Sequence, residues 1–178
     1  MKKFHRFPLF LLFLYILTSG CAHVISKDLR ARTDLSLTFG QVLQNPNAYK
    51  DKNVLWGGEI IQTVNQKDGT TLIEVFQKPL GWRGEPKNLS VSEGRFLVLV
   101  ERYLDPYLYR EGRKITVAGK ILGEKIKPLG EMDYRHPFLL SEQIYVWRDY
   151  YCQYPDPYCR HDPWWDYPLV WRFHFHYD

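Results

Sequence analysis

The feature that most constrains the fold is a series of short runs rich in β-branched and aromatic residues, separated by glycine, proline and polar turns. Runs of this length and spacing are typical of the strands of a small barrel or sandwich. The expected strands are Asn53–Thr63, Thr70–Gln77, Arg95–Glu101, Lys114–Leu122 and Phe138–Trp147. The sequence therefore predicts a mainly β protein.

Interruptions of the pattern favour a barrel over a sandwich. The first run is broken by Gly57 and Gly58, which predicts a bulge or a sharp coil of that strand. A long loop, Lys78–Gly94, precedes the third run, and the polar segment Gly123–Pro137 is expected to lie outside the strands. These features together predict a small antiparallel OB-like barrel.

One short helix is expected before the first strand. Thr38 is a residue type that caps helix N-termini, and apolar residues recur at helical spacing in Phe39–Gln44. Asn45 and Pro46 then end the helix, because the residue before a proline disfavours the helical conformation.

The N-terminus has the pattern of a targeting segment. Basic residues come first, Leu9–Leu17 is an unbroken apolar run too short to span a bilayer, and small residues precede Cys21. This arrangement resembles the lipobox of bacterial lipoproteins, which implies a signal peptide over residues 1–20 and acylation of Cys21. Ala22, where inner-membrane lipoproteins carry Asp, implies sorting to the outer membrane. Residues 21–34 are then expected to form the acylated cysteine and a disordered tether.

The net charge of the mature chain differs from that of the whole chain, because the targeting segment is basic. The whole chain has 24 basic and 20 acidic residues, a formal charge of +4 that on its own suggests a nucleic-acid or anionic-lipid partner. Residues 1–20 hold three of the basic residues, so 21 basic and 20 acidic residues remain from Cys21 onward. A nearly neutral mature chain argues against a nucleic-acid partner.

The last part of the chain, residues 149–178, is an aromatic- and proline-rich extension. Its final eight residues alternate strictly between aromatic and polar side chains, which predicts a terminal strand with one apolar face. Such a strand either adds to the barrel edge or docks on a partner.

Cys152 and Cys159 lie in this extension, and in an oxidising compartment they suggest a disulfide. Two alternatives stay open: free thiols, or a metal site that adds His161 and either His174 or His176. No CxxC or HxxxH spacing supports the metal site. His174 and His176 share one strand face, which is more often a solvated face than a chelating pair.

Catalysis has little support in the sequence. Glu131, Asp133 and His136 cluster before the last expected strand and could act as acid or base groups, but no hydrolase or metalloprotease motif accompanies them. We therefore expect no catalytic residues, no metal and no cofactor. Candidate ligand-binding residues are aromatics that could line a concave face and stack on sugars: Trp56, Trp82, Tyr107, Tyr109 and Tyr134.

Several blocks resemble the Slp family of starvation-inducible outer-membrane lipoproteins of Gram-negative bacteria. They are Phe39–Ile61, Gly94–Val98 and Asp105–Gly123, followed by Tyr134–Pro137 before the strand that ends in Trp147. The resemblance covers Cys21–Trp147, so the family-like barrel domain is expected over residues 35–148. It implies an outer-membrane location and a link to stress, and it implies no catalytic activity.

The sequence thus predicts a non-enzymatic lipoprotein that is anchored in the bilayer through acylated Cys21 and faces the periplasm. Its expected partners are the lipid bilayer and an envelope protein or glycan. The alternative is a carbohydrate-binding module for sugars of peptidoglycan or lipopolysaccharide. A third possibility is metal handling by the Cys/His tail.

Overall fold

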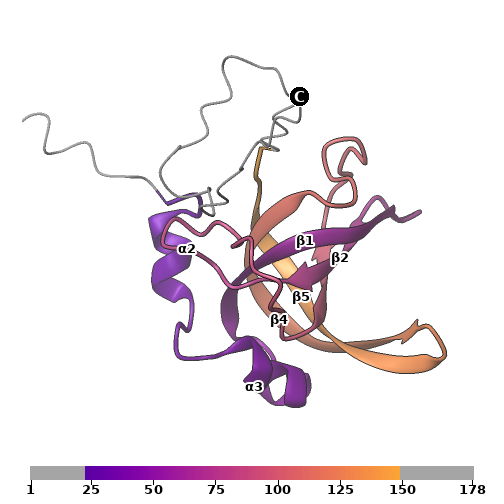
Figure 1. Cartoon of the computed structure of the whole chain (residues 1–178), viewed down its shortest axis with the longest axis horizontal. Coiled ribbons are helices and arrows are strands. Elements are labelled where there is room, and N and C mark those ends of the chain that lie inside the picture. The colour runs from indigo at the N-terminus through magenta and orange to yellow at the C-terminus, as the bar shows by residue number, and fades with distance from the viewer. Residues whose placement is uncertain (1–22, 149–178) are drawn as a thin grey trace, which may run out of the picture. The chain divides into compact units, whose positions relative to one another are not determined.

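The computed structural model describes residues 23–148, which form a closed five-stranded barrel with short helices (Figure 1). The described elements, in chain order, are α2 Lys27–Arg32, α3 Phe39–Gln44, the 3₁₀-helix η1 Pro46–Tyr49, β1 Asn53–Asn65, β2 Thr71–Gln77, β3 Arg95–Val100, β4 Lys114–Leu129 and β5 Met132–Val146. The prediction of a mainly β fold is confirmed.

The strands close the barrel in the order β1-β2-β3-β5-β4, with β4 pairing back onto β1. Four pairs are antiparallel, whereas β3 and β5 are parallel, with Leu97 opposite Phe138. The expectation of a wholly antiparallel barrel was therefore wrong at this pair. The reason is geometric, because an odd number of strands cannot alternate in direction all the way round a closed ring.

Strand β1 pairs with β4 through its first half and with β2 through its second half, so it coils between two neighbours. The Gly57-Gly58 step lies where both pairings meet, and a Cβ at Gly58 would overlap the carbonyl oxygen of Phe76. Strand β1 thus has the predicted coil. The glycines permit it because they let the neighbouring strands approach closely. The bulge itself falls later, between Ile60 and Gln62.

The segment Gly123–Pro137, expected to lie outside the strands, instead belongs to a long hairpin. Strands β4 and β5 stay paired as far as Leu129 and Met132, and Gly130 turns the chain with φ of 62°. In Figure 1 this hairpin extends past the barrel as a curved orange arm. The prediction failed because the arm is a two-stranded ribbon whose exposed polar side chains conceal the strand pattern.

Helix α3 has the predicted bounds. The Thr38 hydroxyl accepts a hydrogen bond from the Gln41 amide, and the Gln41 side-chain oxygen accepts one from the Thr38 amide, so the helix begins with a capping box. Phe39 packs edge-on against Trp56, with ring centroids 4.8 Å apart, and thereby joins the helix to the barrel core.

Residues 23–34 differ from the disordered tether that the sequence suggested. Ser26 caps helix α2, and Ile25 is buried with 1% of its surface exposed. The Gln143 side chain of β5 holds this segment by accepting from the Ser26 amide at 3.0 Å and donating to the Val24 carbonyl at 3.2 Å. The tether prediction failed here because one apolar side chain and a distant glutamine fix a segment that has no apolar periodicity of its own.

Candidate functional site

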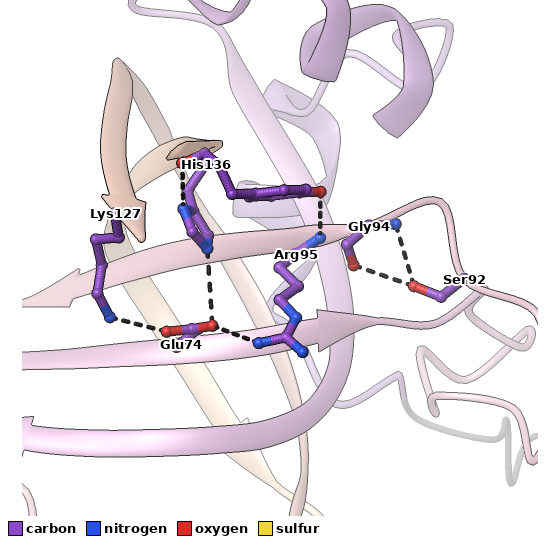
Figure 2. A network of polar contacts seen from close by, with 7 residues as sticks. Glu74, Ser92, Gly94, Arg95, Lys127 and His136 are labelled. Carbon is purple, nitrogen blue, oxygen red and sulfur yellow. Dashed lines mark hydrogen bonds and ion pairs between the residues drawn. The ribbon is translucent and has the colours of Figure 1, made fainter. Parts of the chain in front are cut away.

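The most elaborate polar arrangement in the described residues surrounds Glu74 on the outer face of the barrel (Figure 2). Ile73 and Val75 point into the core, so the side chain of Glu74 between them points outward. Glu74 is nevertheless 9% exposed, because other side chains cover it.

Two cations compensate the buried carboxylate. Arg95 Nη1 of β3 donates to Glu74 Oε1 at 2.9 Å, and Lys127 Nζ of the hairpin arm donates to Oε2 at 2.8 Å. Burial alone opposes ionisation, but these two hydrogen bonds outweigh it and lower the pKa of Glu74 below its usual value of 4.5. The carboxylate is therefore ionised at neutral pH and links three strands.

His136 completes the network from β5. Its Nδ1 lies 3.1 Å from the Tyr134 carbonyl, which can only accept, so Nδ1 carries the proton. Nε2 lies 3.7 Å from Glu74 Oε1 and has no hydrogen-bond partner among residues 23–148. Burial of the ring lowers the pKa of His136 below 6.5, and the nearby Glu74 carboxylate offsets this only in part.

Tyr134 fixes the edge of the network. Its hydroxyl accepts from the Arg95 amide at 3.2 Å, and its ring packs edge-on against the His136 ring, with centroids 4.6 Å apart. Gly94, before Arg95, has φ of 145°, and a Cβ there would overlap the Tyr134 hydroxyl. The glycine thus permits the tyrosine to lie against the start of β3.

This network joins neighbouring parts of the barrel wall through polar contacts. We call Glu74, Arg95, Lys127, Tyr134 and His136 the Glu74 clamp. Both Glu74 oxygens are bound by cations, and His136 is 1% exposed, so both groups are engaged in contacts within the protein. Of the three acid or base candidates in the sequence, only His136 belongs here, since Glu131 and Asp133 are exposed near the hairpin turn. Glu74 was not among the predicted site residues, although a lone carboxylate within an apolar strand is a signal for a buried, compensated charge.

The five candidate aromatic residues do not share one face. Trp56 is 7% exposed within the core, and Tyr134 belongs to the clamp. Trp82 is 70% exposed in the loop after β2, and Tyr107 is 79% exposed in the loop after β3. Because β2 and β3 are antiparallel, these two loops leave the sheet at opposite ends. Tyr109, in the same loop as Tyr107, packs partly against the core.

A surface pocket of about 240 Å³ lies between the segment before α3 and the strands β1 and β2. Trp56 and Leu55 of β1 line it together with Gln77 and Lys78 at the end of β2. Its remaining lining residues are Phe39 of α3 and residues of the connecting segments: Thr33, Asp34, Leu35, Leu37, Thr38, Leu80 and Glu93. The pocket therefore combines an aromatic wall with groups that donate and accept hydrogen bonds.

The other predicted site residues fall outside the described residues. They are Cys21, Cys152, Cys159, His161, His174 and His176. Within residues 23–148, no three His, Cys, Asp or Glu side chains are grouped so as to hold a metal ion. The helices of that same part of the chain are too short and too polar to cross a membrane.

Comparison with known proteins identifies the family. The model of the outer membrane lipoprotein Slp family matches residues 18–171. Outer membrane protein Slp of Escherichia coli K12 is 27% identical over 139 residues, which cover 77% of this chain and 72% of that protein. The lipoprotein YeaY of the same organism is 28% identical over 120 residues, covering 67% of this chain and 61% of YeaY.

A protein of Haemophilus influenzae is 30% identical over 97 residues, which cover 54% of this chain and 52% of that protein. The family match is the broadest of these similarities, since it takes in the barrel and begins three residues before Cys21. The chain belongs to the Slp family of outer membrane lipoproteins.

Proposed function

We propose that this chain is a non-enzymatic lipoprotein of the cell envelope, held on the periplasmic face of the outer membrane by acyl chains on Cys21. The observation that carries the proposal is the span of the family match, which begins at Thr18 and so includes Cys21 with the barrel. Two or three acyl chains hold a protein on a bilayer stably, because each buried CH₂ contributes about 0.8 kcal/mol.

The barrel supports a scaffold or binding role over catalysis. Its interior is filled by side chains with less than 2% of their surface exposed, among them Phe96, Ile60 and Ile115. The order of its five strands fits an OB-like fold, which usually binds ligands on its outer surface and loops. The association with starvation or stress rests on the family resemblance.

Metabolic labelling with a palmitate analogue tests the anchor. The wild type should incorporate label and Cys21→Ser should not, whereas the matched control Cys152→Ser should label like the wild type because it keeps the proposed acceptor. Equal labelling of the wild type and Cys21→Ser would contradict the proposal.

A carbohydrate-binding role is the second candidate, and the pocket beside Trp56 favours it. Sugars bind where an aromatic face meets side chains that form hydrogen bonds, and the pocket combines the partly covered Trp56 ring with the exposed Glu93 side chain. Lys78 Nζ already donates to the Leu89 carbonyl and the Gln77 oxygen accepts from the Glu93 amide, so Glu93 is the side chain left to bind a sugar hydroxyl. The full chain in detergent should then sediment with purified peptidoglycan sacculi. Glu93→Gln should weaken that binding, while Glu111→Gln, in the loop after β3, should not. Absence of the wild type from the pellet would refute this role.

A further inference from the structure

The point where the chain reaches the barrel from its anchor is fixed in place. The Val24 amide donates to the Arg83 carbonyl at 3.4 Å, and the Gln143 side chain binds Val24 and Ser26. The ring of His23 lies so close to Gly84 that a Cβ there would approach its Cε1 at 2.8 Å. Residues 23–26 are therefore part of the folded domain.

Only a very short linker therefore separates Cys21 from the folded domain. Cys21 precedes His23 by two residues, which can span about 7 Å at full extension. Acyl chains on Cys21 would enter the bilayer beside the loop that contains Arg83. A linker of this length is too short to let the barrel move away from the membrane surface.

The loop beside this linker is closed by backbone hydrogen bonds and carries an exposed tryptophan. Leu80 and Pro86 form a β-bridge across it, and the Gly81 amide donates to the Glu85 carbonyl at 2.7 Å. At its tip Trp82 is 70% exposed, and the Arg83 guanidinium lies 5.8 Å from the centre of its ring. We call residues 80–86 the anchor loop.

The chemistry of this tip matches a bilayer interface. Tryptophan is enriched at the boundary between acyl chains and headgroups because its ring is apolar and its N–H can donate. Arginine pairs with lipid phosphates through its planar donor groups. The exposed Trp82 ring and the exposed Arg83 side chain therefore supply one group suited to the interface and one suited to the headgroup phosphates.

We propose that the anchor loop is a second membrane contact, with the Trp82 ring in the interface of the leaflet that holds acylated Cys21 and Arg83 bound to lipid phosphates. This inference rests on the proposed acylation. It fixes the orientation of the domain, because the loop after β3, which carries Tyr107, leaves β2 and β3 at the opposite end and faces away from the bilayer.

The test uses the full lipidated protein in vesicles of phosphatidylethanolamine and phosphatidylglycerol whose acyl chains carry bromine, a short-range quencher of tryptophan fluorescence. Wild-type protein is compared with Trp82→Phe and with the matched variant Trp82→Phe/Tyr107→Trp, which moves an exposed tryptophan to the opposite end. The intensity lost on bromination should fall at least about twofold in Trp82→Phe. The second variant should not restore it.

Flotation of the same vesicles separates the two proposals. If the wild type floats, Cys21→Ser does not, and bromination quenches wild type and Trp82→Phe equally, the anchor stands and the second contact is refuted. Restored quenching in the Tyr107→Trp variant would refute the orientation. If wild type and Cys21→Ser behave alike in flotation, the lipid anchor fails and this inference fails with it.

Discussion

Burying a carboxylate is unfavourable unless cations and hydrogen bonds compensate it, and Glu74 meets this condition with partners from two other strands. Removing its charge leaves Arg95 and Lys127 facing each other without an anion. Their side chains are 28% and 32% exposed, so water can relieve part of the loss.

Glu74→Gln should therefore lower the free energy of unfolding by about 1–3 kcal/mol, measured by urea denaturation. The control Glu101→Gln, at an exposed position, should change it by less than about 0.5 kcal/mol. Equal effects of the two substitutions would show that the clamp contributes nothing to stability.

His136 makes stability depend on pH. Its folded-state pKa lies below the unfolded value of 6.5, so the unfolded chain binds more protons between the two values. The contribution of His136 is complete above about pH 6.5 and is lost as the pH falls toward the folded pKa. Glu74 acts in the same direction at lower pH, below its unfolded value of 4.5.

The variant His136→Asn keeps a donor for the Tyr134 carbonyl but cannot titrate. Between about pH 8 and pH 5.5, wild-type stability should fall more steeply than that of the variant. Urea denaturation at both pH values measures this difference between the two proteins. His23 is present in both, so its contribution cancels. Parallel pH profiles for the two proteins would exclude His136 as the titrating group.

At the level of elements, the sequence was most informative where the pattern is local. Helix α3 could be predicted to the residue because Thr38 and Pro46 mark its two boundaries. The cores of the strands were likewise visible as β-branched runs. The outer halves of β4 and β5 were hidden because the ribbon has few apolar residues. Lys125 and Arg135 face solvent there, and Glu124 forms an ion pair with Arg135 across the two strands.

The glycines of β1 give an element-scale prediction. At Gly58 an added Cβ would overlap backbone of β2, which cannot move without breaking the sheet, so Gly58→Ala should cost about 3 kcal/mol or more. Gly112 has φ of 80° and open space around it, so Gly112→Ala should cost about 1–2 kcal/mol for its conformation alone. Thermal or urea denaturation ranks the two variants, and a larger loss at Gly112 would contradict the close-approach argument.

The Glu74 clamp could not be predicted, because its members are joined by strand pairing rather than by sequence spacing. Glu74 and Lys127 are 53 positions apart, on strands that are not neighbours in the barrel, and meet only because the Lys127 side chain reaches the Glu74 carboxylate. The same holds for Gln143 and Ser26, 117 positions apart, whose hydrogen bond turns an expected tether into part of the domain.

At the scale of the whole molecule, the proposed orientation of the domain on the membrane depends on that N-terminal segment. If it is integral to the fold, Ile25→Ala should lower the free energy of unfolding by about 2–4 kcal/mol, as expected for a fully buried side chain. Lys27→Ala, at an exposed helix position, is the matched control. An Ile25→Ala protein as stable as wild type would mean that the segment is only loosely attached.

The proposed anchor and the proposed second membrane contact both depend on the chemical state of Cys21, which mass spectrometry of the protein extracted from the outer membrane measures directly. Trypsin cleaves after Lys27, so a chain that begins at Cys21 gives the peptide Cys21–Lys27, whereas an unprocessed chain gives a peptide that begins after Arg6. The peptide Cys21–Lys27 should begin the mature chain and carry a diacylglyceryl thioether together with an amide-linked acyl chain. An unmodified Cys21, or a mature chain that still contains residues 1–20, would contradict it.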